Sequence, residues 1–199
     1  MIFAIVFSIM LLLLRVRFKD WNVKSMFLIL LLACFVSASY GYSTARKIGD
    51  VLEWGLPLTA LSSTYAMDDY NGFKSFMKSY ATTVTATIIL KEMTHKQRPD
   101  GSDYRSFPSG HTSSAFAGAS FIHFRYGLKY SIPLYMLAAF TGYSRVESKK
   151  HYTEDVIAGA GLAILSSWYF TSPYSKKYSF NMRYDINEKE ASLTIIKLF

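Results

Sequence analysis

The stretch "SFPSGHTSSAFAG", residues 106–118, is where a turn passes into a helix of small residues. Ser109 is a preferred capping residue, Gly110 lets the backbone approach a ligand, and His111 falls in the first helical turn. A helix start has unpaired N–H groups and the positive end of the helix dipole. The stretch therefore predicts an anion site at a helix start, although a capped helix with an incidental histidine fits the same residues.

Moderately apolar segments with helix-like spacing surround this stretch, and no Val/Ile-rich alternating strands separate them. Their interiors are rich in Thr, Ser, Ala and Gly, which suits closely packed helices. The sequence therefore predicts an all-α fold, a helical bundle of about six core helices that is membrane-embedded or membrane-associated. The expected helices are 21–40, 51–67, 73–98, 112–126, 130–145 and 152–170.

The two ends of the chain differ from this middle part. Residues 1–45 contain two apolar stretches shorter than the ~20 residues of an upright membrane span, so we expect an N-terminal apolar anchor or signal region there. Residues 46–172 form the expected helical domain. Residues 173–199 form a polar tail that is either a loose terminus or ends in a short strand.

Composition restricts the class of partner. The chain has 199 residues, 51% of them hydrophobic, and a mean hydropathy of +0.15. Its net charge of +8 favours anionic partners such as phosphorylated molecules, anionic lipid surfaces or nucleic acid. Cys34 is the single cysteine of the sequence, which excludes a disulfide within the chain and a cysteine zinc site.

Basic residues in "LKEMTHKQRPD" form a second candidate site. Lys91 and Arg98 are seven residues apart and would share one face of a helix, together with His95. Pro99 places this pair near the helix end. A lysine point charge and an arginine fork can clamp a phosphate, whereas a solvated basic helix tip is the simpler interpretation.

A third candidate lies in "SRVESKKHYTED". His151 and Asp155 are four residues apart, so on a helix the carboxylate reaches the imidazole. An aspartate on one ring nitrogen fixes the tautomer and frees the other nitrogen to attack or to bind metal. Arg145 adds a cation nearby, and a surface ion pair is the alternative interpretation.

Together, K-x6-R-P, P-S-G-H and S-R-x5-H-x3-D occur in this order over residues 91–155. This three-part pattern resembles the type-2 phosphatidic acid phosphatase family, which also includes class A acid phosphatases and vanadium haloperoxidases. The resemblance implies a helical bundle with all three motifs at one end. It also implies a two-step phosphoryl transfer that uses no metal and no other cofactor.

The resemblance further implies a role for each motif residue. His151 would be the nucleophile that forms a phosphohistidine, and Asp155 would orient it. His111 would protonate the leaving alcohol and then activate water. The phosphate oxygens would be held by Lys91, Arg98, Ser109, Gly110 and Arg145. Apart from the resemblance, we expect Arg105, Tyr143 and Tyr152 to line the substrate entrance.

We therefore expect a phosphoric monoester hydrolase acting on lipid phosphates or pyrophosphates, such as phosphatidic acid, phosphatidylglycerophosphate, undecaprenyl pyrophosphate or lipid A. The alternative is a periplasmic nonspecific acid phosphatase for soluble phosphomonoesters. Nucleic acid is not expected as a partner, because the basic residues accompany the motif histidines instead of forming a stripe with exposed aromatics. A metal site of His111, His151 and Asp155 is a further alternative, which a chelator would reveal.

Charge also predicts an orientation. The basic segment 15–24 belongs on the inner side of a bacterial-type inner membrane, as do Arg125, Lys129, Lys176 and Lys177. The motif ends of the helices then face the periplasm or the exterior. The alternative is secretion to the periplasm after cleavage of a signal.

Overall fold

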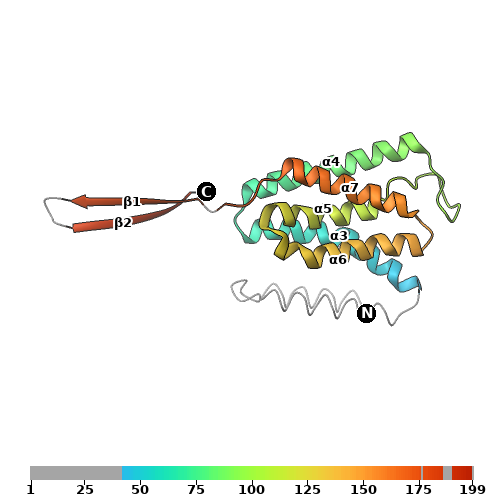
Figure 1. Ribbon diagram of the computed structural model, residues 1–199, viewed down its shortest axis with the longest axis horizontal. Helices are drawn as coiled ribbons and strands as arrows, with labels where there is room; N and C mark the ends of the chain where they lie inside the picture. Colours follow the sequence, from blue (N-terminus) through green and yellow to red (C-terminus); the bar gives the residue numbers. More distant parts are fainter. Residues whose placement is uncertain (1–41, 176, 186–189, 199) are drawn as a thin grey trace.

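The computed structural model describes residues 42–175, 177–185 and 190–198, so the expected anchor and the expected helix 21–40 lie outside the described residues. Residues 42–170 form a helical bundle, which confirms the all-α prediction for this part of the chain (Figure 1). Its helices are α3 (Tyr42–Ala66), α4 (Tyr70–Thr94), α5 (Gly110–Tyr126), α6 (Leu128–Glu147) and α7 (Thr153–Phe170).

Two helix boundaries differ from expectation. α3 begins at Tyr42, well before the predicted start at residue 51. α4 ends at Thr94, because His95 adopts a left-handed cap conformation with φ 44° and Pro99 disfavours helix at the residue before it. Lys91, His95 and Arg98 therefore do not share one helix face, and that prediction is wrong.

α5 is the central helix of the bundle and packs against α3, α4, α6 and α7 (Figure 1). Its small residues allow close approach of neighbouring backbones. A Cβ on Gly118 would lie 2.5 Å from the carbonyl of Leu56 in α3, so only glycine fits at this crossing. The stretch "SFPSGHTSSAFAG" thus begins the helix on which the other helices are assembled.

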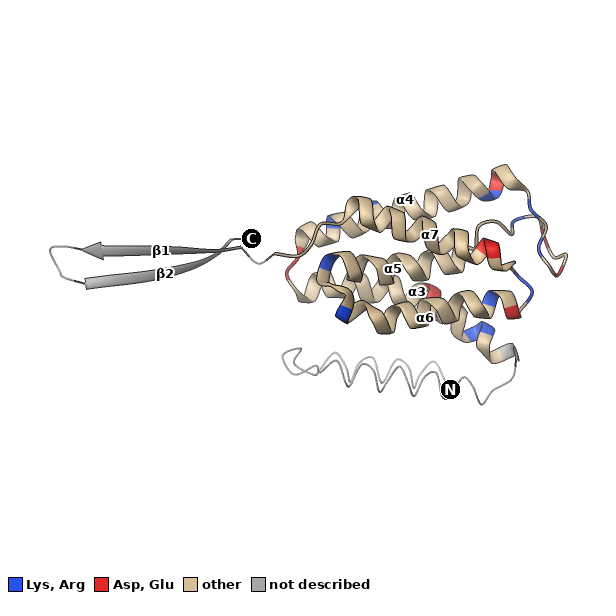
Figure 2. Ribbon diagram, viewed as in Figure 1, with Lys and Arg blue, Asp and Glu red and all other residues tan. Residues whose placement is uncertain are grey.

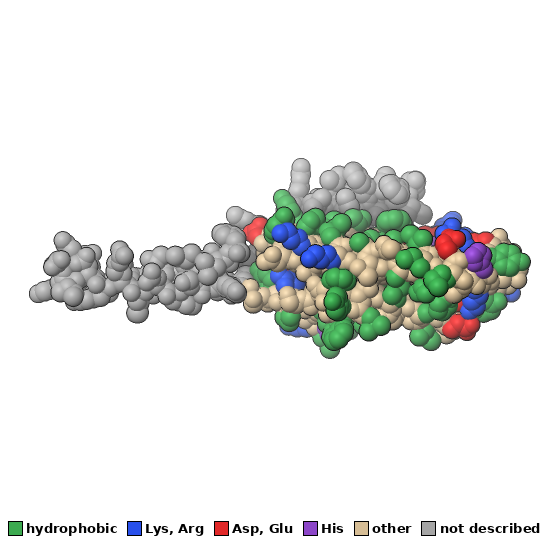
Figure 3. Space-filling model, turned by 90° about the horizontal axis from the view of Figure 1, so that it is seen from above, with side chains coloured by type: hydrophobic (Ala, Val, Ile, Leu, Met, Phe, Trp, Pro, Cys, Tyr) green, Lys and Arg blue, Asp and Glu red, His purple; other side chains and the backbone are tan. Residues whose placement is uncertain are grey.

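The interior of the bundle is unusually polar and its sides are apolar. Ser79, Thr83 and Ser120 are fully buried, and their hydroxyls donate to helix carbonyls. Trp54 is 63% exposed and Leu165 is 64% exposed. Charged residues gather toward the ends of the bundle, and apolar side chains cover much of the helix surface (Figures 2 and 3). Among the described helices, none has both the length and the apolar content needed to cross a membrane.

Two strands follow the bundle in the polar tail. β1 (Lys177–Asp185) and β2 (Glu190–Leu198) pair antiparallel, from Lys177 opposite Leu198 to Asp185 opposite Glu190. The sequence predicted at most one short strand here, and the first half of the tail supplies its partner.

Candidate active site

The three sequence motifs meet at one end of the bundle. This end holds the last turn of α4, the first turn of α5, the end of α6 and the start of α7 (Figure 1). The connection 95–109 between α4 and α5 contributes Arg98 and Ser106, and the connection 148–152 contributes His151. Residues that lie far apart in the chain are thereby brought to one place.

The start of α5 is fixed by backbone and hydroxyl contacts. Ser109 is its N-cap, and its buried hydroxyl bonds the hydroxyl of Thr112 at 2.9 Å. The Ser109 N–H donates to the carbonyl of Asp155 at 2.9 Å, which ties α5 to α7. Gly159 permits this approach, because a Cβ there would lie 2.6 Å from the Ser109 carbonyl oxygen. The backbone of Gly110 thus faces the cationic residues from a rigid position.

His151 is the candidate nucleophile and is only 3% exposed. Its Nδ1 donates to the carbonyl oxygen of Ser106 at 2.7 Å. A carbonyl only accepts, so Nδ1 carries the proton and Nε2 has a lone pair for attack on phosphorus. The backbone of Ser106 therefore sets the tautomer.

The expected hydrogen bond between Asp155 and His151 is absent from this end of the bundle, where both residues are described. His151 precedes α7, which begins at Thr153, so the helical spacing of four residues does not apply. Asp155 Oδ2 lies 3.8 Å from His151 Nδ1, too far for a hydrogen bond but close enough for electrostatic attraction. The carboxylate thus influences the ring by its charge.

Asp155 is fully buried and receives bonds from three groups. Oδ2 accepts from the Ser106 hydroxyl at 2.5 Å and from the Tyr152 N–H at 2.9 Å, and Oδ1 accepts from Lys96 Nζ at 2.7 Å. Burial alone would raise the pKa of Asp155, but the bonds from Lys96 and Ser106 lower it below its ordinary value. The sequence did not predict a role for Lys96 or Ser106.

The site keeps His151 neutral. Burial lowers the pKa of His151 to about 3, assisted by the charges of Lys91 and Arg98. Burial also lowers the pKa of Lys91 to about 8, together with the charges of Arg98 and Arg105. The lysine, the arginines and the histidine therefore lie close enough together to change one another's pKa.

His111 lies against two carboxylates of α3. Its Nε2 is 3.1 Å from Asp50 Oδ1 and 3.0 Å from Glu53 Oε2, and because carboxylates accept, Nε2 carries a proton. Burial and the charge of Arg145 together lower the pKa of His111 to about 4. Sequence reasoning missed both carboxylates, although two acidic residues in the apolar segment "GDVLEWGLPL" were a signal.

Arg145 is also held by α3. It is 2% exposed, its Nη1 donates to Asp50 at 2.7 Å, and its Nη2 donates to the carbonyl of Arg46 at 2.6 Å. A phosphate at this guanidinium would therefore compete with Asp50. Asp50 links the arginine and His111 into one group.

Lys91 and Arg98 are positioned by the connection 95–109. Lys91 Nζ donates to the carbonyls of Arg105 at 2.8 Å and Pro108 at 2.6 Å, which leaves one of its three N–H donors for a phosphate oxygen. Arg98 Nε donates to Asp103 at 2.7 Å, and its two NH₂ groups can serve the substrate.

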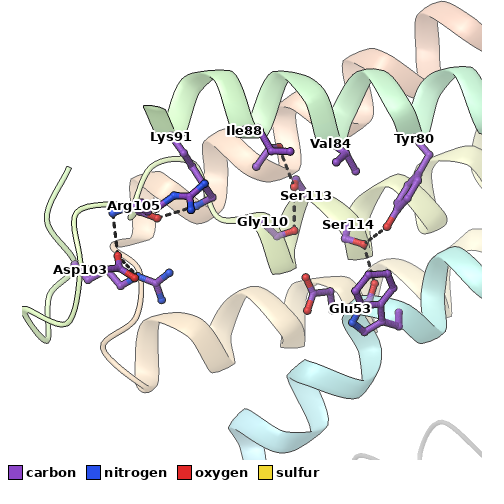
Figure 4. Close-up of a pocket in the computed structure, with 13 residues that line it drawn as sticks. Glu53, Tyr80, Val84, Ile88, Lys91, Asp103, Arg105, Gly110, Ser113 and Ser114 are labelled. Carbon is purple, nitrogen blue, oxygen red and sulfur yellow. Dashed lines mark hydrogen bonds and ion pairs between the residues drawn. The ribbon is translucent and has the colours of Figure 1, made fainter. Parts of the chain in front are cut away.

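A pocket of about 370 Å³ opens between α3, α4 and α5 (Figure 4). Arg105 lies at its charged end, as predicted for an entrance residue, whereas Tyr143 and Tyr152 do not line it. Its charged end contains Lys91, Arg98, Asp103, Arg105 and Gly110, and its side wall contains Trp54, Tyr80, Val84 and Ile88. The pocket therefore joins a group of charged side chains to an apolar wall.

Among the described residues, no three His, Cys, Asp or Glu side chains are arranged to hold a metal ion. His111, His151 and Asp155 therefore do not form the metal site that the sequence left open. His111 faces the α3 carboxylates, and His151 faces the carbonyl of Ser106.

Comparison with known proteins identifies relatives of this architecture. The model of the PAP2 superfamily matches residues 72–179. The lipid A 4′-phosphatase of Helicobacter pylori is 34% identical over 173 residues, which span 78% of this chain and 86% of that protein. The lipid A 1-phosphatase of Porphyromonas gingivalis is 46% identical over 71 residues, 34% of this chain but only 16% of that protein.

The fold likeness extends to a solved structure. The crystal structure of Aquifex aeolicus LpxE superposes with a TM-score of 0.57 at 19% sequence identity. The match covers 76% of this chain and 96% of that chain. At this identity the likeness concerns the fold of the bundle.

Proposed function

Since this chain belongs to the PAP2 superfamily and is a phosphatase of that family, we propose that it hydrolyses a phosphate monoester of a lipid A-type glycolipid through a phosphohistidine intermediate. The 4′-phosphate is the first candidate, because the relative named for that position matches over most of both chains. The observation that carries the lipid assignment is the pocket that runs from Lys91 and Arg98 to an apolar wall.

In the first step the lone pair of His151 Nε2 attacks phosphorus. A P–N bond forms, the bond from phosphorus to the sugar oxygen breaks, and His111 transfers a proton to that oxygen. Lys91, Arg98 and Arg145 stabilise the negative charge on the phosphate oxygens, together with the backbone N–H of Gly110 and the cap at Ser109. His111 is neutral without substrate, and the phosphate dianion raises its pKa so that it can act as the acid.

In the second step a water molecule attacks the phosphohistidine. His111 now accepts a proton from the water, a P–O bond forms, and the P–N bond breaks to release inorganic phosphate and neutral His151. The charge of Asp155, 3.8 Å from Nδ1, stabilises the positive ring of the phosphohistidine. Histidine, acid and cations thus supply the whole reaction.

The apolar side wall of the pocket favours a lipid substrate over a soluble one. Trp54 is 63% exposed and Ile88 is 49% exposed, and both line the pocket that ends at Lys91. An acyl chain that lies against these side chains would bury their apolar surface. This burial would stabilise the bound lipid by ~25 cal/mol per Å². A soluble phosphomonoester would leave this wall unused.

The test is phosphate release by the purified protein from matched substrates. Hexaacylated lipid A bisphosphate is compared with its deacylated glucosamine disaccharide and with p-nitrophenyl phosphate, and mass spectrometry identifies the position of the lost phosphate. We expect kcat/KM to be at least about a hundredfold higher for the acylated substrate. Equal kcat/KM for the acylated and deacylated forms would instead favour the nonspecific acid phosphatase.

We propose further that the bundle lies in a membrane with its active-site end on the outer side. The apolar sides of the helices support this location. The orientation follows the expectation that Arg125 and Lys129, at the opposite end, lie on the inner side, and it takes the more numerous basic residues of the active-site end as groups that serve the phosphate site. In a chain that also carries Cys34→Ser, an impermeant maleimide should label Ser102→Cys in intact cells and should label Lys129→Cys only after lysis. The reverse pattern would place the active site inside.

A further inference from the structure

Lys96 makes contacts that differ from those of the other basic residues of the site. Its Nζ donates to Asp155 Oδ1 at 2.7 Å and to Glu154 Oε1 at 2.6 Å. It also lies 4.5 Å from the centre of the Tyr152 ring and 5.8 Å from that of Phe107. Two carboxylates and an aromatic face thus occupy the ammonium group, and Lys96 does not line the pocket that Lys91 and Arg98 share.

The backbone of Lys96 belongs to the same group of contacts. Its carbonyl oxygen accepts from the Ser106 N–H at 2.9 Å. Ser106 in turn donates its hydroxyl to Asp155 and accepts the Nδ1 proton of His151 through its carbonyl. Lys96 therefore contacts both residues that border the nucleophile, and contacts neither the nucleophile nor the pocket.

We propose that Lys96 is a positioning residue for His151. It keeps Asp155 ionised, and it holds Ser106 so that the serine carbonyl accepts the Nδ1 proton of His151. The inference rests on the proposed role of His151 as the nucleophile. It assigns a function to a residue that lies inside the K-x6-R-P motif but is not one of its fixed positions.

The physical reason is the competition for Asp155. Asp155 is fully buried, and a buried carboxylate stays ionised only when charged or hydrogen-bonding partners stabilise it. Without Lys96, the Asp155 carboxylate loses its cationic partner. It can then take up a proton, or it can move toward His151 Nδ1, which lies 3.8 Å away. Either change weakens the bond between Nδ1 and the Ser106 carbonyl and turns the Nε2 lone pair away from phosphorus.

Charged groups surround His151 from every neighbouring element. Asp155 comes from α7, Lys91 from α4, Arg98 from the connection 95–109 and Arg145 from α6, whose carbonyl accepts the His151 N–H at 3.2 Å. Lys150 adjoins it but is paired with Asp100. Removal of the positive charge of Lys96 raises the proton affinity of Asp155 and of His151 together. The acid limb of kcat/KM should therefore move to higher pH.

The experiment compares Lys96→Met, Lys96→Arg and the control Lys78→Met in the full chain. Lys78 is an exposed lysine of α4 far from the active-site end. With lipid A bisphosphate, Lys96→Met should lower kcat by about 10- to 100-fold, as loss of a supporting contact does elsewhere, with KM changed less than about threefold. Lys96→Arg should recover most of kcat, and Lys78→Met should equal the unmodified protein.

The pH profile distinguishes positioning from a merely structural role. The acid limb of Lys96→Met should lie at higher pH than that of the unmodified protein and of Lys96→Arg. An unchanged limb, with Lys96→Arg as inactive as Lys96→Met, would overturn the proposal. A higher KM at unchanged kcat would also overturn it, because Lys96 would then bind substrate.

A second variant covers the case in which Lys96→Met does not fold. Ser106→Ala keeps the carbonyl bonded to His151 and removes the hydroxyl bonded to Asp155. It should lower kcat without changing KM, and combined with Lys96→Gln it should cost less than the sum of the two single effects. Full additivity would contradict the proposal. Retained activity in His151→Ala would instead refute the proposed function itself, which separates the two failures.

Discussion

At each end of the bundle a buried aspartate begins a helix and binds a basic side chain from another segment. Asp69 is the N-cap of α4 and accepts from the Gly72 N–H at 2.9 Å, from Arg125 Nε at 2.7 Å and from the Tyr126 hydroxyl at 3.0 Å. Asp155 lies in the first turn of α7 and accepts from Lys96, Ser106 and Tyr152. Both carboxylates have a lowered pKa although burial opposes it.

The difference lies in what adjoins the ion pair. Arg125 binds Asp69 through two nitrogens and also donates to the carbonyl of Ser172, and the Tyr126 hydroxyl donates to Asp69, so these contacts close that end of the bundle. Asp155 has His151 3.8 Å away. The same kind of buried contact thus stabilises the bundle at both ends, and at one of them it also adjoins the proposed nucleophile.

The largest expected effect is at the active-site end. His151→Ala should lower phosphate release by at least about a thousandfold, because it removes the atom that forms the covalent intermediate. Circular dichroism and the melting temperature should remain close to those of the unmodified protein. Retention of more than about a tenth of the rate would mean that His151 is not the nucleophile.

The opposite end should show the reverse pattern. Arg125→Met leaves Asp69 buried without its partner and should lower the free energy of unfolding by about 3–5 kcal/mol, while the folded fraction keeps its kcat at low temperature. Adding Asp69→Asn removes the buried charge and keeps the cap, so much of the stability should return. Chemical unfolding in detergent measures the stability of the single and of the double variant. A lower kcat in folded Arg125→Met would mean that the two ends are not independent.

His111→Ala should have an effect that depends on the leaving group. A sugar alcohol needs a proton as it leaves, whereas p-nitrophenolate hardly does, so the first step with lipid A should slow by about 10²–10⁴-fold and that with p-nitrophenyl phosphate much less. Rapid-quench measurement of the phosphoenzyme burst isolates this step. Equal slowing with both substrates would leave His111 only a phosphate-binding role.

The smallest expected effect is the pH dependence of stability. The pKa values of His151 and His111 are lowered in the folded protein, to about 3 and about 4, from an ordinary 6.5. Between the lowered pKa values and the ordinary 6.5, the unfolded chain therefore binds more protons than the folded protein. The free energy of unfolding should fall as pH drops from 7 to 4.5, by on the order of 2 kcal/mol for each histidine. His151→Asn should show a shallower slope. An equal slope would mean that the histidine titrates normally.

The sequence predicted the helical class and the convergence of three motifs, because both depend on short-range patterns. It did not predict Asp50 or Glu53, since nothing in the spacing relates α3 to His111, 61 residues away. It also assigned the tautomer of His151 to Asp155, four residues on. The structure assigns it to the Ser106 carbonyl, and a backbone acceptor has no signature in the pattern of side chains.

The length of α4 illustrates the same limit. Residues 95–98 contain neither glycine nor proline, so the sequence indicated a helix end only at Pro99, near Arg98. The left-handed conformation at His95 redirects the chain, so that Lys96 and Arg98 point from a connection and not from a helix face. Local propensity could not show this, because the contacts of Lys96 with α7 and of Asp100 with Lys149 form only in the folded bundle.

The position of Ser106 also constrains the order of biosynthesis. This serine emerges from the ribosome well before its partners, since 45 residues separate it from His151 and 49 from Asp155. Lys91 of α4 and the start of α5 are therefore synthesised before the α7 contacts that complete the site can form. If His151 is the nucleophile, phosphatase activity can begin only when α7, the last helix of the bundle, has been synthesised and packed.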